Sequence, residues 1–186
     1  YCDEYTKLLL QFTIVIVSIP SGYDSACIIS SENDVVLSFT TAGTESWTIP
    51  STISSVDYLV VAGGGGGGGI NGGAGGGAGG FRTDTLSVTP SSSVEVTVGA
   101  GGTAGASDQP GGNGGNSVFS TISSTGGGGG GGSSADAPSG GSGGGSKHVF
   151  NPGAGNLGGY TPAEGYAGGA GVDSAWSSGG GGGASE

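Results

Sequence analysis

The chain has 186 residues, of which 49 are glycine, and its 14 acidic residues against three basic ones give a net charge of −11. That charge excludes an extended phosphate-binding surface, so we expect neither nucleic acid nor an anionic membrane as a partner. The charged fraction of 9% is far below that of chains that remain disordered through charge. We therefore predict an ordered protein of one domain or slightly more.

The N-terminal stretch Leu8–Ser18 predicts a long strand, because apolar residues recur at a period of two. One face is entirely apolar and consists of Leu8, Leu10, Phe12, Ile14 and Ile16. The composition is also that of a signal-peptide core, but acidic Asp3 and Glu4 precede it rather than a basic cluster. The stretch is too short to span a bilayer. We interpret it as a strand of the mature protein and expect no membrane insertion.

The next segments are also predicted to be strands, and no window has helical periodicity with proper caps. The predicted strands are Ala26–Ser30, Val35–Thr41, Trp47–Ile49, Val56–Ala62, Phe81–Thr89, Val94–Val98, Ser117–Ser123 and Lys147–Phe150. Val56–Ala62 is apolar except for Asp57, which predicts burial on both faces. Phe81–Thr89 and Val94–Val98 are expected to form a hairpin around the turn-forming residues 90–93.

Glycine dominates the chain after residue 62, in tracts at about 63–80, 99–116, 126–146 and 153–183. The tracts lack the Gly-X-Y period, so they are not collagen. We predict polyglycine II packing, in which extended threefold helices hydrogen-bond to their neighbours and glycine is required where they meet. A set of long, loosely ordered loops is the alternative.

These patterns predict an all-β fold: a jelly-roll-like β-sandwich with a glycine-rich lobe of polyglycine II-type segments and little or no helix. We divide the chain into an N-terminal assembly segment (1–22), the first part of the sandwich (23–62) and the glycine-rich lobe (63–186). Sandwich strands at 81–98 and 117–123 interrupt the lobe.

Five motifs follow one another in a fixed order after residue 35: Tyr58–Gly65, Gly75–Phe81, Val94–Gly102, Gly111–Phe119 and Gly126–Gly132. This order resembles the glycine-rich domain of phage tail-fibre and tail-tip proteins, which also occurs in secreted structural proteins. The resemblance implies β-sandwich elements, polyglycine packing, and an adhesive or structural role. The first 30 residues lie outside the resemblance.

Cys2 and Cys27 predict one disulfide, and with it an oxidising compartment, although two free buried thiols are the alternative. The bond could form within one chain or between neighbouring chains. Because a simple hairpin around Pro20–Gly22 would place Cys2 opposite residues near 40, an intrachain bond requires a different path.

We expect no catalytic, cofactor-binding or metal site and therefore no enzyme. His148 is the only histidine, and no Gly-x-Ser-x-Gly motif in a strand-turn-helix setting accompanies it. The stretch around Asn116 approaches a calcium-binding nonapeptide, but a single copy with Asn in the Asp position favours a structural turn.

Two functions remain. The first is the subunit of an extracellular filament, a homopolymer in which the N-terminal strand completes the sheet of the next subunit. The second is a phage tail-fibre or tip adhesin that binds a cell-surface glycan or protein receptor. Its candidate contact residues are Ile70, Tyr160, Tyr166 and Trp176. Both functions place the protein outside the cell, on a cell surface or on a virion surface.

Overall fold

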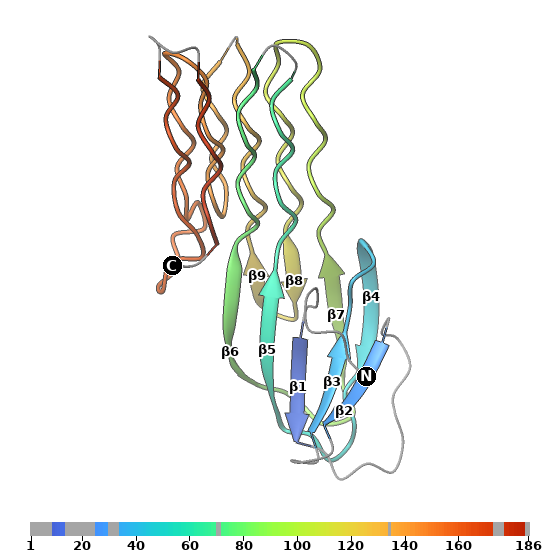
Figure 1. Cartoon of the computed structure of the whole chain (residues 1–186). Helices are drawn as coiled ribbons and strands as arrows, with labels where there is room; N and C mark the ends of the chain where they lie inside the picture. The colour runs from blue at the N-terminus through green and yellow to red at the C-terminus, as the bar shows by residue number, and fades with distance from the viewer. Residues whose placement is uncertain are drawn as a thin grey trace. The chain divides into compact units, whose positions relative to one another are not determined.

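The computed structural model describes residues 9–13, 25–29, 34–69, 72–133, 135–172 and 177–184 (Figure 1). These residues form strands and extended segments without a helix, which confirms the all-β prediction. The chain divides into two compact units. Unit 1 comprises Tyr1–Val60, Arg82–Val98 and Val118–Ile122, and unit 2 comprises Val61–Phe81, Gly99–Ser117 and Ser123–Glu186.

The larger sheet has five strands in the order β2-β3-β1-β5-β6. They are β1 (Leu9–Thr13), β2 (Ser25–Ile29), β3 (Asp34–Ser38), β5 (Ser55–Val61) and β6 (Phe81–Ser87). β1 is antiparallel to both of its neighbours, β3 and β5. The described strand nearest the N-terminus therefore occupies the middle of the sheet.

The second sheet has four strands in the order β4-β7-β8-β9. They are β4 (Gly43–Thr48), β7 (Ser93–Val98), β8 (Ser117–Phe119) and β9 (Ile122–Ser124). β4 begins at Gly43, ahead of the predicted strand Trp47–Ile49, so the prediction missed the first residues of this strand. β4 and β7 pair over their full length, from Gly43 opposite Val98 to Thr48 opposite Ser93.

Both sheets contribute to one hydrophobic core in unit 1. Phe119 is fully buried at its centre, with its ring centroid 6.3 Å from that of Trp47 and 6.4 Å from that of Tyr58. The tilted rings gain stabilisation beyond the burial of their area. The other buried members are Leu37, Phe39, Ile49, Ile53, Val56, Val60 and Val96.

β5 is buried on one face only, so the prediction of burial on both faces is wrong. Val56, Tyr58 and Val60 are buried, whereas Asp57 is exposed and Val61 is 39% exposed. The strand is antiparallel to its neighbour β1, and such a strand can present one face to solvent, unlike a strand in a helix-covered parallel sheet.

The predicted hairpin of Phe81–Thr89 with Val94–Val98 is also wrong. β6 lies in the five-stranded sheet and β7 in the four-stranded sheet, so the connection passes from one sheet to the other. The Val88 N–H donates to Ser54 O (2.9 Å), and the Ser91 N–H donates to Ile49 O (3.0 Å). These bonds hold the connection against earlier parts of the chain.

Two further strand predictions need correction. Ser117–Ser123 is divided into β8 and β9 by a tight turn, in which Ser120 has a φ of 55°. Lys147–Phe150 is a turn in which the Phe150 N–H donates to Lys147 O (3.1 Å). Of these four residues only Lys147 makes a β-bridge, to Ser178.

Candidate functional site

The glycine tracts of unit 2 form extended segments that run side by side (Figure 1). We call each of them a rod and name it by its residues. The rods are 63–69, 73–80, 99–105, 109–116, 125–132, 140–146, 151–156, 165–171 and 178–183. They lack strand ladders, and their backbone hydrogen bonds go from one rod to another.

Rod 125–132 shows the period of three that defines a polyglycine II helix. The Gly127 and Gly130 N–H groups donate to Gly63 O and Gly66 O (2.9 and 2.8 Å). The N–H groups one position further, Gly128 and Gly131, donate to Ser142 O and Gly145 O (both 2.8 Å). Successive donors therefore serve different neighbouring rods, as a threefold helix requires, and the predicted polyglycine II packing is found.

Asparagine side chains complete the third row of donors on this rod. Asn116 Oδ1 accepts the Gly126 N–H (2.9 Å), and Asn113 Oδ1 accepts the Gly129 N–H (3.0 Å). The two asparagines are three residues apart, like the two glycines that they serve. Asn116 thus lies in an extended rod rather than in the predicted structural turn, and its side chain accepts a hydrogen bond from another rod.

Glycine is required in two of the three rows of rod 63–69. A Cβ atom on Gly63, Gly66 or Gly69 would lie 2.1, 2.0 or 1.9 Å from a carbonyl oxygen of the region 100–107. A Cβ atom on Gly65 or Gly68 would lie 2.1 or 2.2 Å from a carbonyl oxygen of rod 125–132. Real Cβ atoms do not approach so closely, so only glycine allows the rods to pack at this distance.

The third row of the same rod has no such constraint. A Cβ atom on Gly64 or Gly67 would be 3.7 or 3.8 Å from the nearest carbonyl oxygen, which is ordinary van der Waals contact. Both residues are exposed. The packing of the described chain therefore does not explain why these positions are glycine.

Hydrogen bonds connect the rods into two layers. The rods of one layer are, in order, 99–105, 63–69, 73–80 and 178–183, and those of the other are 109–116, 125–132, 140–146 and 165–171. Further bonds connect the two layers, and rod 151–156 bonds to rod 140–146 of the second layer. Residues 126–132 and 140–147 are buried throughout, so the core of unit 2 is backbone rather than side chain.

A buried carboxylate joins the ends of several rods. Glu164 is 0% exposed, and its Oε2 accepts the Thr125 N–H (2.8 Å) while Oε1 accepts the Gly158 N–H (3.2 Å). The Ser124 hydroxyl is a longer contact to Oε2 (3.5 Å). Hydrogen bonds to a charged acceptor offset part of the cost of removing the carboxylate from water. Sequence reasoning missed Glu164, although it is the only acidic residue between Asp136 and Asp173.

A second carboxylate holds the loop before rod 151–156. Asp136 accepts hydrogen bonds from the Asn151 backbone N–H (2.8 Å) and from Asn151 Nδ2 (3.1 Å). These two bonds keep the pKa of Asp136 below its ordinary value, because they favour the ionised form.

The structure describes part of the predicted assembly strand. Leu10 and Phe12 lie in β1, whereas Leu8, Ile14 and Ile16 lie outside the described residues. Leu10 is aligned with Leu37 of β3 and with Tyr58 of β5, and both of these partners belong to the buried core. β1 thus fills a position between two core strands.

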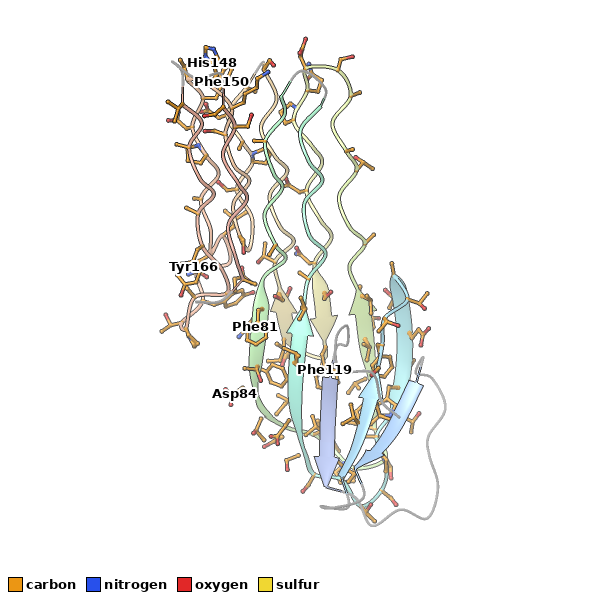
Figure 2. All side chains as sticks on the ribbon, in the orientation of Figure 1. Phe81, Asp84, Phe119, His148, Phe150 and Tyr166 are labelled. Atoms are coloured by element: carbon orange, nitrogen blue, oxygen red, sulfur yellow. The ribbon has the colours of Figure 1, made fainter. Side chains whose placement is uncertain are left out.

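The predicted recognition residues are only partly described. Tyr166 is 41% exposed at one end of the rods (Figure 2), and Tyr160 is half-buried in the loop before it. Ile70 and Trp176 lie outside the described residues. Cys2 also lies outside them, and Cys27 is in β2, for which only the backbone is described, so the disulfide stays a prediction.

Within the described part of the chain, no three His, Cys, Asp or Glu side chains gather closely enough to hold a metal ion. The same residues contain no helix with the length and apolarity needed to cross a membrane.

Together, the two antiparallel sheets and the rods define an all-β protein with a polyglycine II lobe. The model of a family described as a glycine-rich domain matches residues 40–186. The chain belongs to this family. No curated protein and no solved structure matches the chain.

Proposed function

We propose that the chain is a non-enzymatic structural subunit of an extracellular filament, which polymerises head-to-tail by exchange of its N-terminal strand. One observation carries the proposal: β1, the first described element, lies between β3 and β5 inside its sheet. We expect that β1 can leave this position while β3 and β5 keep theirs. An identical strand from a neighbouring subunit would satisfy the same hydrogen bonds.

The energetics favour filling this position in every subunit. Without β1, the facing edges of β3 and β5 would present unpaired N–H and C=O groups beside the core residues Leu37 and Tyr58. A strand inserted from a neighbour would fill this slot between β3 and β5. The neighbour's own slot would then be open for the strand of the next subunit. Such a heterologous contact does not close, so it generates a filament.

The exposed row of the lobe supports self-association as well. Gly64, Gly67 and Gly101 are exposed and have room for a Cβ atom, the nearest atom in each case lying at 3.7–3.8 Å. Where rods pack against each other in this chain, they meet through backbone atoms, without side chains between them. Glycine at these positions is therefore suited to contact between the lobes of neighbouring subunits in a fibre.

Deletion of Tyr1–Ser18 should abolish filament formation, because the subunit loses the strand that it would donate. Negative-stain electron microscopy of the purified chain, with and without the deletion, measures this directly. A synthetic peptide of residues 1–18 should bind the deleted protein and cap its slot, whereas a scrambled peptide should not. Filaments that form unchanged from the deleted protein would refute strand exchange.

The second candidate is a phage tail-fibre or tip adhesin. It is favoured by the exposed apolar side chains at one end of the rods, where Leu157 is 62% exposed beside the tyrosine-containing loop 158–166. Binding to whole cells that is lost on replacing this loop would support the adhesin. A purified chain that forms filaments unaided would count against it.

A further inference from the structure

The first layer of rods has an outer face without charge. Its four rods, which are 99–105, 63–69, 73–80 and 178–183, contain no charged residue, although the net charge of the chain is −11. In the two central rods of this layer every exposed residue is a glycine, namely Gly64, Gly67 and Gly75. The exposed residues of the second layer instead include Asn113 and Asn116. Only the first layer therefore lacks side chains at the centre of its outer face.

The same face has backbone groups without a partner among the described residues. In rod 63–69, five of the seven N–H groups donate to neighbouring rods at 2.9–3.0 Å. The N–H groups of Gly64 and Gly67 donate to no described residue, and Gly65 O and Gly68 O accept from none. A polyglycine II helix has no internal hydrogen bonds, so only water or a further rod can satisfy these groups.

The inner face of the first layer shows what kind of partner fits such a surface. There, the Gly127 and Gly130 N–H groups of the second layer donate to Gly63 O and Gly66 O. A partner must therefore bring its own backbone into contact and match a repeat of about 9.3 Å along the rod. The outer face of the first layer in a second copy of the chain meets both requirements. Because this face is uncharged, two acidic copies repel each other least where these faces meet.

We propose that the outer face of the first layer binds the same face of a second copy of this chain. With a two-fold axis between the copies, Gly64 and Gly67 of each chain would donate to free carbonyl oxygens of the other, such as those of Gly65 and Gly68. Packing within one chain leaves room for a Cβ atom at Gly64 and Gly67, whereas packing between chains requires glycine there. The contact extends the proposed function by joining filaments side by side, but it does not depend on strand exchange.

Amide hydrogen exchange of the full chain tests this contact, in a dilute and in a concentrated solution, with single amides followed by NMR. The Gly64 and Gly67 amides should exchange without protection when dilute and about tenfold or more slowly when concentrated. The amides of Asn113 and Asn116 are the internal control, because they are exposed and donate to no described residue. They should exchange at the same rate at both concentrations.

A pair of variants adds one negative charge on or away from the face. Gly67→Glu has room for its Cβ atom and should remove the concentration-dependent protection of the Gly64 amide. Ala154→Glu adds the same charge at an exposed position of rod 151–156, which bonds to the second layer. This control should leave the protection of Gly64 unchanged.

Fast exchange of Gly64 and Gly67 at both concentrations would overturn the proposal. Slow exchange at both would overturn it too, because the row would then be covered within one chain, and so would protection that survives Gly67→Glu. If Gly67→Glu does not fold, the two concentrations of the unmodified chain still decide. Filaments in which these amides exchange fast would remove the lateral contact and leave strand exchange intact, whereas protection in chains that keep their own β1 would do the reverse.

Discussion

Alanine at Gly66 should destabilise the polyglycine lobe by about 3 kcal/mol or more. The added Cβ atom would lie 2.0 Å from Thr103 O, and no flexible side chain is there to move aside. Gly66 also donates to Gly112 O (2.9 Å) and accepts from the Gly130 N–H (2.8 Å). A shift of this rod would therefore disturb two others. Urea unfolding measures the loss of stability, and amide hydrogen exchange of residues 127–130 measures the same loss within the lobe.

The adjacent Gly67 provides the matched control. A Cβ atom there would meet Ala74 O at 3.8 Å, and extended polyglycine II backbone suits alanine. Gly67→Ala should be neutral or should stabilise the lobe by about 0.4–1 kcal/mol, since alanine has less conformational freedom to lose on folding. Equal destabilisation by the two substitutions would contradict the threefold packing, because that packing makes neighbouring glycines inequivalent.

Replacement of Glu164 by alanine should cost about 3 kcal/mol in the free energy of unfolding. The substitution leaves the Thr125 and Gly158 N–H groups without their acceptor and opens a void beside Gly80. Glu164→Gln keeps the shape and one acceptor oxygen, so we expect a smaller loss, of about 1–2 kcal/mol. The stabilities are measured by urea unfolding.

Glu45 serves as the control for Glu164, because it is an exposed carboxylate in β4. Glu45→Ala and Glu45→Gln should change the unfolding free energy by no more than about 0.5 kcal/mol. If Glu164→Ala proved as mild as Glu45→Ala, the carboxylate would not be the link between rod ends that its hydrogen bonds indicate.

The sequence predicted the strands better than their partners. Alternation in Val94–Val98 identified β7, but the same alternation suits pairing with β4 or with β6, and the choice depends on the fold of the core. The apolar run of β5 likewise did not reveal that one face is left exposed. Local pattern determines that a strand forms, whereas packing of distant residues determines where it lies.

The polyglycine rods were predictable, and the functions of individual residues in them were not. Gly66 and Gly67 are identical in sequence context, yet only Gly66 faces a backbone from residues 102–103. Glu164 and Lys147 are buried because donors or acceptors from Thr125 and Ser133 reach them across the lobe. Such pairings join residues that are separated in the chain, and no periodicity in the sequence predicts them. The spacing of Asn113 and Asn116 was the one local signal of a cross-rod role.

A disulfide trap tests strand exchange most directly. Gln11 of β1 is aligned with the exposed Asp57 of β5, so cysteines at both positions can bond once β1 is in place. The experiment uses Gln11→Cys and Asp57→Cys in a chain with Cys2→Ser and Cys27→Ser. Filaments are oxidised and then separated by size in denaturant without reductant. The chain with Gln11→Cys alone is the control.

Strand exchange predicts a ladder of covalent oligomers, because the cysteine introduced at position 11 of each subunit bonds to the one introduced at position 57 of the next. The control should run as monomer and occasional dimer. Filaments that yield only monomers, each with an internal disulfide between these two introduced cysteines, would contradict the account, since β1 would then remain in the sheet of its own chain.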